Sequence, residues 1–418
     1  MRSVRALPFL IFGLAGSSSA QDCSIPFLVP MFDVHAELGI PYGTVTRFNG
    51  TTIELAMDLY KPIGDDQTER PLVVAIHGGG FTSGSRADLQ DLCQGLASMG
   101  WAAATISYRL GFYGNGILEP PYAYDPAEIH RAAYRAAQDA KAAIRFLKGR
   151  HALDSTSTNS VFLIGFSAGA ITSLHAAYMD EADEKPSSCG AIGDVQHFFN
   201  FYPRPDLGPV EGELNQNGQD ASVMGVVSIF GAIADTAWMA GEVDPALYTY
   251  HQSGDPIVGC GHAQPYWGVG LGVPDQYPYM HGSCSIDGYV QQIESEPGHY
   301  MHHLHNGNAH DVHDVPAVLL EASIWMRELF CAAATHVDGP TAHEDLQVHP
   351  NPANGLLHVS GPGVDRSPYR VTDALGRTIR TGTMEQGTLA IDLLAPGMYH
   401  LHLDEPGRKR LAAFVVAR

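Results

Sequence analysis

The chain has 418 residues, of which 45% are hydrophobic and 9% aromatic, a composition typical of globular proteins at a length that allows two or three domains. Its 24 basic and 45 acidic side chains give a net charge of −21. A surface that acidic repels phosphate backbones, which argues against a nucleic-acid partner.

The first twenty residues have the order of a secretory signal peptide. Arg2 and Arg5 precede the apolar run LPFLIFGLAG, and the small residues Ser18 and Ala20 follow at cleavage-site spacing. Residues 1–20 are therefore predicted to be a signal peptide that directs export through the periplasm; the alternative is a buried N-terminal helix. No later segment approaches about eighteen uninterrupted apolar residues, so no membrane span is expected.

The six cysteines predict disulfides and do not suggest a zinc site. None forms a C-x-x-C pair, and an even number in an exported chain allows up to three disulfides in fifteen connectivities. Cys260 and Cys284 are the preferred pair, because both lie in one long loop region that needs bracing.

The central part of the chain alternates apolar runs with helical patterns, which predicts a three-layer α/β domain with a mostly parallel sheet. The clearest helix begins at Asp125-Pro126, a capping side chain followed by proline at the first helical position. Seven segments read as strands: Ile53–Tyr60, Leu72–Ile76, Ala102–Tyr108, Ser160–Ile164, Val223–Phe230, Ala246–His251 and His299–His305.

Composition changes after Cys331. Residues 336–346 belong to a polar stretch without periodicity, typical of a linker between a domain at 21–335 and a tail at 347–418. Short alternating strands in the tail predict a small β-sandwich.

The tail resembles the C-terminal sorting domain of the type IX secretion system, through "VHPNPANGLLHV", "YRVTDALGRTIRTG", "LAPGMYHLHL" and "RLAAFVVAR" in that order. The resemblance implies an export address read by the secretion machinery, and a secreted or cell-surface protein. The alternative, a sandwich that binds carbohydrate, is weakened because the tail has no tryptophan.

The motif G-F-S-A-G at residues 165–169 follows a predicted strand and precedes a helical run, which is the context of a nucleophile elbow. Glycines on both sides of Ser167 avoid collisions at a sharp turn, and the helix N-terminus favours developing negative charge. Ser167 is therefore the candidate nucleophile.

A second glycine motif, H-G-G-G-F at residues 77–81, follows the Leu72–Ile76 strand. Its backbone N–H groups can point at a substrate oxygen. Gly78 and Gly79, together with the N–H of Ala168, are predicted to form an oxyanion hole; the alternative is a glycine turn that serves only packing.

A triad in the order serine, acid, histidine needs two further residues. Asp255 follows the strand at Ala246–His251, and His310 follows the strand at His299–His305, so both lie at the carboxyl edge of the sheet. His310 would move the serine proton, and Asp255 would hold the imidazole. Asp235 is the rival acid and His313 the rival base.

The histidine run before His310 also invites a metal site, with Asp311 and Asp314 as carboxylates. No recognised ligand spacing appears, and strand alternation sends neighbouring side chains to opposite faces. We therefore expect no metal and no cofactor. The six imidazoles are His299, His302, His303, His305, His310 and His313.

These motifs resemble the α/β-hydrolase family, in particular carboxylesterases and lipases with an HGGGF oxyanion motif. The blocks DLYKP, ISYRLG and AAQDAKAAIRFLK add to the resemblance, which runs from about Val45 to Phe330. It implies an eight-stranded, mostly parallel sheet flanked by helices, and a serine carboxylesterase of the EC 3.1.1 class.

The substrate is predicted to be a small-molecule or polymer-linked ester, hydrolysed through an acyl-enzyme. Residues 256–309 form a long insert that could wall the site, and its aromatic side chains could receive an ester or pack the insert's own core. Trp238 could line the acyl side. The alternatives are a non-catalytic hydrolase-like binding module and a serine peptidase of the same fold. The insert aromatics are Tyr266, Trp267, Tyr277, Tyr279 and Tyr289.

Overall fold

The chain divides into two compact units, residues 1–335 and 336–418, which are described separately. The computed structural model describes residues 23, 25, 27–64, 67–115, 122–240, 244–269, 272–293, 298–335, 347–350, 353–361, 364–373, 377–395, 397–405 and 408–416. The expected signal peptide and linker lie outside the described residues.

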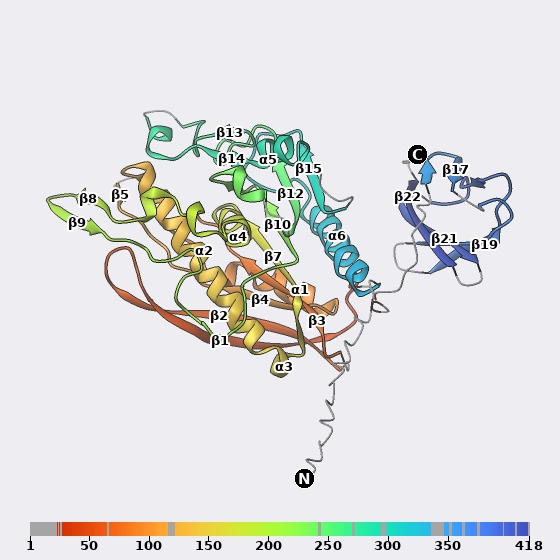
Figure 1. Cartoon of the computed structure of the whole chain (residues 1–418), viewed down its shortest axis with the longest axis horizontal. Helices are drawn as coiled ribbons and strands as arrows, with labels where there is room; N and C mark the ends of the chain where they lie inside the picture. Colours follow the sequence, from red (N-terminus) through yellow and green to blue (C-terminus); the bar gives the residue numbers. More distant parts are fainter. Residues whose placement is uncertain are drawn as a thin grey trace, which may run out of the picture. The chain divides into compact units, whose positions relative to one another are not determined.

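An eight-stranded sheet forms the centre of the first unit, in the order β1-β2-β4-β3-β7-β10-β12-β15 (Figure 1). The pairs β1–β2 and β2–β4 are antiparallel and all other pairs are parallel. This confirms the predicted mostly parallel sheet. The strands are β1 (Asp33–Thr46), β2 (Thr52–Ile63), β3 (Arg70–Ile76), β4 (Ala102–Ile106), β7 (Thr156–Phe166), β10 (Gly225–Ile229), β12 (Ala246–Gln252) and β15 (Tyr300–His305).

Helices cover both faces of the sheet, which explains why its central strands are continuously apolar. In β3, Val73 and Ala75 pack into a cluster with α1 and α6, whereas Leu72, Val74 and Ile76 pack into a second cluster with α2 and α4. No helix within the described residues is long and apolar enough to cross a membrane. The helices are α1 (Gln90–Ser98), α2 (Pro126–Gly149), α3 (His151–Asp154), α4 (Ala168–Tyr178), α5 (Ser283–Val290) and α6 (Val315–Thr335).

Helix α2 begins where the sequence predicts. The Asp125 side chain accepts a hydrogen bond from the Ala127 N–H at 3.0 Å, and Pro126 occupies the first helical position. One face of the helix carries alanine and aliphatic residues and is buried in the cluster that it shares with the sheet, so the helix axis can lie close to the sheet. That face consists of Ile129, Ala133, Ala136, Ala140, Ile144 and Leu147.

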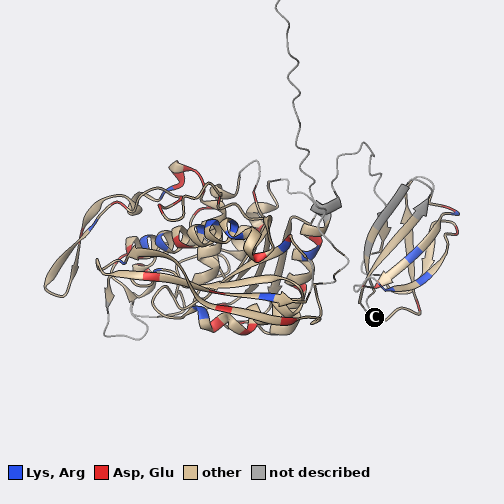
Figure 2. Ribbon diagram, turned by 90° about the horizontal axis from the view of Figure 1, so that it is seen from below, with Lys and Arg blue, Asp and Glu red and all other residues tan. Residues whose placement is uncertain are grey.

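Buried cationic side chains extend along another side of α2, and Figure 2 shows the blue bands along this long helix. Arg131 donates to the carbonyls of Ser188 and Gly190. Further along the helix, Lys141 and Arg145 pair with Glu211. Because a buried cation must find acceptors, these contacts fix the long excursion between α4 and β10, whose only strands are the hairpin β8 (Ile192–His197) and β9 (Asn200–Arg204).

The insert after β12 folds against the edge of the sheet. Its strands β13 (His262–Ala263) and β14 (Met280–Gly282) join β11 (Ala232–Ile233) in a small sheet. The expected Cys260–Cys284 disulfide is present, and a second bond joins Cys23 to Cys331 across 308 residues. Cys93 and Cys189 are free and buried. A further antiparallel pair consists of β5 (Gly114–Asn115) and β6 (Tyr122–Ala123).

The second unit is built from two antiparallel sheets around their own apolar core, which confirms the predicted β-sandwich. Leu357, Val371, Leu401 and Phe414 are fully buried within that core. The three-stranded sheet contains β16 (Gln347–His349), β17 (Leu356–Ser360) and β20 (Thr388–Ala390); the four-stranded sheet contains β18 (Pro368–Asp373), β19 (Thr378–Thr383), β21 (Gly397–Glu405) and β22 (Arg408–Val416).

Candidate active site

Ser167 occupies a strained turn between β7 and α4. Its φ of 55° and ψ of −121° lie in a region that residues with side chains rarely adopt. A Cβ on Gly165 would lie 2.3 Å from the Gly169 carbonyl oxygen, and a Cβ on Gly169 would lie 2.1 Å from the Ile76 carbonyl oxygen. Both flanking glycines are therefore required by close backbone approach, as the sequence predicts for a nucleophile elbow.

His310 lies between Ser167 and Asp255. Its Nε2 is 2.8 Å from Ser167 Oγ, and its Nδ1 is 2.6 Å from Asp255 Oδ2. Gln252 holds the loop that carries the histidine, because its Oε1 accepts from the Ala309 N–H and its Nε2 donates to Asp311. The structure thus brings the three predicted residues into one hydrogen-bonded chain.

Asp255 is 1% exposed and is held as a carboxylate. Burial raises its pKa, but hydrogen bonds from His251 and His310 and from the Ile257 backbone outweigh burial and lower the pKa to about 2. Its Oδ1 accepts from the N–H groups of Ile257 at 2.8 Å and Val258 at 3.1 Å. The ionised form is therefore the form that faces His310.

The rival acid and base lie elsewhere. Asp235 is exposed and caps a short 3-10 helix by accepting from the Ala237 N–H. His313 shares a hydrogen bond with the Tyr250 hydroxyl at 2.9 Å and stacks on His305. Among the residues that the structure describes, neither Asp235 nor His313 forms a hydrogen bond with Ser167.

The H-G-G-G-F loop lies beside Ser167. A Cβ on Gly78 would lie 2.9 Å from the Phe166 carbonyl oxygen and 3.2 Å from Ser167 Cβ. Gly79 has a φ of +108°, which favours glycine. His77 fixes the start of the loop, because its Nδ1–H donates to the Gly78 carbonyl at 2.8 Å and its ring stacks on Tyr108.

A cavity of about 510 Å³ contains Ser167 and His310. The three residues predicted for the oxyanion hole line it, and so does Phe230, whose ring lies 4.5 Å from that of His310. Most of the remaining lining is apolar or aromatic and comes from two regions, the β6–α2 region and the insert: Tyr122, Ile129, Ile257, Val258, Pro265, Tyr266, Val269, Tyr277 and Met280.

The aromatic candidates divide between wall and scaffold. Tyr266 and Tyr277 line the cavity, whereas Tyr279 is 59% exposed. Trp267 donates from Nε1 to the Asp255 carbonyl oxygen at 2.6 Å and so braces the acid's turn. The Tyr289 side chain packs against the main core. Trp238 is not a wall of this cavity, which corrects the expectation above: it packs edge-on against His175.

A second cavity of about 570 Å³ lies between β1, α2 and the excursion after α4. Five arginines and four carboxylates line it, and two of the arginines, Arg109 and Arg204, form ion pairs with lining carboxylates. Its described lining contains no serine or cysteine beside a histidine, so of the two cavities only the first holds the predicted nucleophile.

Histidines of the run other than His310 make local contacts. His302 pairs with the Thr249 hydroxyl, His303 with Glu321 and His299 with the Asp244 carbonyl. Among the residues that the structure describes, no group of three or more histidine, cysteine, aspartate or glutamate side chains is arranged to hold a metal ion.

Sequence reasoning missed His251, Gln252 and Phe230 as site residues. His251 and Gln252 are the last two residues of β12 and lie four and three residues before Asp255. Two polar side chains at the end of an apolar strand were the sequence signal for them. Phe230 follows β10 and has a φ of 43°, a conformation that no sequence pattern predicts for phenylalanine.

Two family models match the chain. Residues 57–263 match the BD-FAE family, and residues 347–417 match the secretion system C-terminal sorting domain. No curated protein matches the chain.

Similar solved structures include three esterase structures. A truncated carbohydrate esterase from gut microbiota is 15% identical, with 73% of this chain and 98% of that chain covered and a TM-score of 0.42. A thermophilic esterase from the planctomycete Thermogutta terrifontis, bound to propionate, is 15% identical over 74% of this chain and 97% of its own, with a TM-score of 0.42. Esterase 2 of that organism, phosphoramylated by tabun, is 14% identical over 73% and 97%, with a TM-score of 0.43.

Proposed function

Because the chain is an α/β-hydrolase of an esterase family that ends in a type IX secretion sorting domain, we propose that it is an exported serine carboxylic-ester hydrolase. The observation that carries the proposal is the hydrogen-bonded chain from Asp255 through His310 to Ser167 inside an apolar cavity. The sorting domain indicates a secreted or cell-surface protein.

The first half of the reaction forms an acyl-enzyme. His310 Nε2 takes the proton of Ser167 Oγ as that oxygen attacks the ester carbonyl carbon. The carbonyl oxygen becomes an oxyanion, which accepts hydrogen bonds from the N–H groups of Gly78, Gly79 and Ala168. Each such donor typically contributes about 3 kcal/mol of transition-state stabilisation. The alcohol then leaves with the proton that His310 holds.

The second half releases the acid. Water gives a proton to His310 as it attacks the acyl carbon, and collapse of the intermediate returns that proton to Ser167. Asp255 stays ionised throughout and stabilises the positively charged imidazole, in line with its pKa of about 2.

The cavity favours an uncharged ester with an apolar or aromatic group. Its volume of about 510 Å³ falls within the range of small-molecule sites, and its wall carries three tyrosines, Tyr122, Tyr266 and Tyr277. Among the lining residues that the structure describes, the only ionisable groups other than tyrosine phenols are those of the proposed chemistry, so none of these residues pairs with a charged substrate group.

The test is hydrolysis of p-nitrophenyl acetate, butyrate and a long-chain ester by the exported form and by Ser167→Ala, together with fluorophosphonate labelling. We expect Ser167→Ala to lose both hydrolysis and labelling. The matched controls Asp235→Asn and His313→Gln replace the rival acid and base and should keep both. Equal hydrolysis by wild type and Ser167→Ala would refute the proposal. A wild type that is not labelled would favour the alternative, a non-catalytic binding module.

A further inference from the structure

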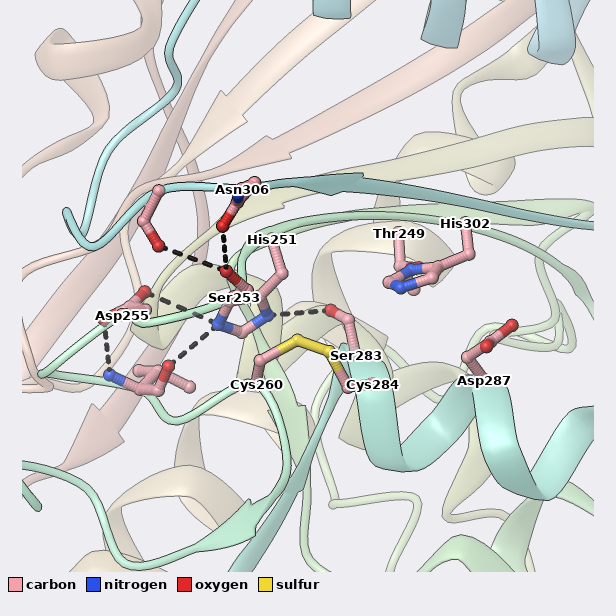
Figure 3. Close-up of a disulfide and its surroundings, with 12 residues drawn as sticks. Thr249, His251, Ser253, Asp255, Cys260, Ser283, Cys284, Asp287, His302 and Asn306 are labelled. Atoms are coloured by element: carbon pink, nitrogen blue, oxygen red, sulfur yellow. Dashed lines mark hydrogen bonds and ion pairs between the residues drawn. A yellow bond between two sulfur atoms is a disulfide. The ribbon is translucent and has the colours of Figure 1, made fainter.

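His251 lies behind the acid of the proposed triad and is fully buried (Figure 3). Its Nε2 is 2.8 Å from the Val258 carbonyl oxygen, and its Nδ1 is 2.9 Å from Ser283 Oγ. A carbonyl oxygen can only accept a hydrogen bond, so Nε2 carries the proton, and Nδ1 accepts a hydrogen bond from the Ser283 hydroxyl. The two contacts therefore fix both the orientation and the tautomer of this imidazole.

The same Nε2–H faces Asp255. It lies 3.4 Å from Asp255 Oδ2, the oxygen that also accepts from His310 Nδ1 at 2.6 Å. One carboxylate oxygen is thus shared between two imidazoles, a short contact to the proposed base and a longer contact to His251. The longer contact is a second restraint on the same carboxylate oxygen.

The Cys260–Cys284 disulfide joins the two segments that hold His251. Val258 lies two residues before Cys260, and Ser283 lies one residue before Cys284. The Cys260 carbonyl oxygen also accepts from the Cys284 N–H at 2.8 Å. Figure 3 shows the disulfide directly beside Ser283 and the His251 ring.

We propose that His251 is a positioning residue for Asp255, and that the Cys260–Cys284 disulfide keeps the two partners of His251 in register. The inference deepens the proposed function: it relies on ester hydrolysis for its kinetic measurement, but the arrangement itself is independent of catalysis. It assigns to this disulfide an effect on the triad that the other disulfide, Cys23–Cys331, does not have.

The expected signature is a shift in pH dependence. Without the His251 N–H, the negative charge on Asp255 loses one stabilising donor. The carboxylate then holds the proton of His310 more strongly, which raises the pKa of that imidazole. The acidic midpoint of the kcat/KM profile should then move to higher pH by about half a unit. A side chain with a purely structural role would lower the amount of active protein equally at every pH.

Other titratable groups around this network must be held constant. His302 on β15 and Asp287 on α5 lie near His251, and burial is the main cause that lowers the pKa of His302. Asp311 contacts Gln252 beside the His310 loop. None of these residues is altered in the variants below, so their titration contributes equally to each profile.

The experiment compares four variants by kcat/KM against pH and by thermal unfolding. His251→Phe fills the volume without polar atoms and should shift the midpoint and lower kcat/KM about tenfold. His251→Gln keeps an amide donor for the Val258 carbonyl and for Asp255, and should restore the wild-type midpoint. Cys260→Ser with Cys284→Ser should reproduce part of the His251→Phe shift. Cys23→Ser with Cys331→Ser is the matched control, and should lower the melting temperature and leave the midpoint unchanged.

A folded His251→Phe with the wild-type midpoint would overturn the proposal, as would equal shifts from the two disulfide variants. If His251→Phe does not unfold cooperatively, Ser283→Ala replaces it, because that variant keeps the ring and removes only one partner. The low-field proton NMR signal of His310 Nδ1–H supplies a measurement that needs no activity: it should move in His251→Phe. A wild type that shows this signal but no labelling by fluorophosphonate would count against the proposed function alone.

Discussion

Adding one methyl group to Gly169 should disable the elbow while leaving Ser167 itself in the chain. The new Cβ would lie 2.1 Å from the Ile76 carbonyl oxygen and 2.5 Å from that of His77, whereas ordinary contacts begin at 3.4 Å. Both neighbours are backbone atoms, so the first turn of α4 must move away from the end of β3 by more than about 1 Å. That movement separates Ser167 from Gly78.

The cost of Gly169→Ala follows from that displacement. Overpacking of a rigid site costs about 1–3 kcal/mol of unfolding free energy. A misplacement of about 1 Å at reacting atoms costs about 100-fold in rate. We therefore expect kcat/KM for p-nitrophenyl acetate to fall at least 100-fold, and urea denaturation to show a loss of about 2 kcal/mol.

Gly95→Ala is the matched control. Gly95 lies inside α1, and a Cβ there would meet nothing within 4 Å. The same chemical change should raise the free energy of unfolding by about 0.5–1 kcal/mol, because alanine is the better helix former, and should leave activity unchanged. Wild-type activity in Gly169→Ala would refute the account of the elbow.

Three further predictions concern the acid, the excursion after α4 and the cavity wall. Asp255→Asn should lower kcat/KM about 10⁴-fold at pH 7. Because the folded pKa of about 2 lies below the unfolded value of about 3.9, the stability from this carboxylate is complete above pH 4 and is lost as the pH falls toward 2. Between pH 4 and pH 2 the variant should therefore lose about 2 kcal/mol less unfolding free energy than the wild type. Glu211→Gln leaves two buried cations without their carboxylate and should cost about 2 kcal/mol in urea, whereas exposed Glu213→Gln should stay within about 0.5 kcal/mol; equal losses would contradict the ion-pair account. Tyr266→Ala should raise the butyrate-to-acetate ratio of kcat/KM about tenfold, and an unchanged ratio would mean that this wall does not meet the acyl group.

Local signals explain what could be predicted from the sequence. The strand at Leu72–Ile76 is buried on both faces, so its apolar run is continuous. The glycines of the elbow are required because carbonyl oxygens of the neighbouring strand or of the next helical turn lie too close for a Cβ. Strand β1 escaped prediction because it is an edge strand: eight of its fourteen residues are exposed, and Pro41 and two register shifts interrupt its pairing.

Contacts between distant residues could not be predicted in the same way. His251 reads as the last residue of a strand, and its partners Val258 and Ser283 meet it only after the insert has folded. The Cys260–Cys284 pair was accessible because 24 residues separate the two cysteines, whereas Cys23 and Cys331 are neighbours only in the finished fold. Trp238 illustrates the opposite error, since an aromatic side chain near the right strand faces His175 and not the cavity.

The Cys23–Cys331 bond gives the catalytic unit the topology of a ring. A protease that cuts once anywhere between these residues leaves a single covalent molecule, which would migrate as one band until it is reduced. A cut after Thr335 that releases the sorting domain likewise leaves both ends of the ring tied together. The disulfide cannot form until Cys331 has reached an oxidising compartment. Because Cys331 lies near the end of this unit, the bond must form after nearly the whole unit has been exported.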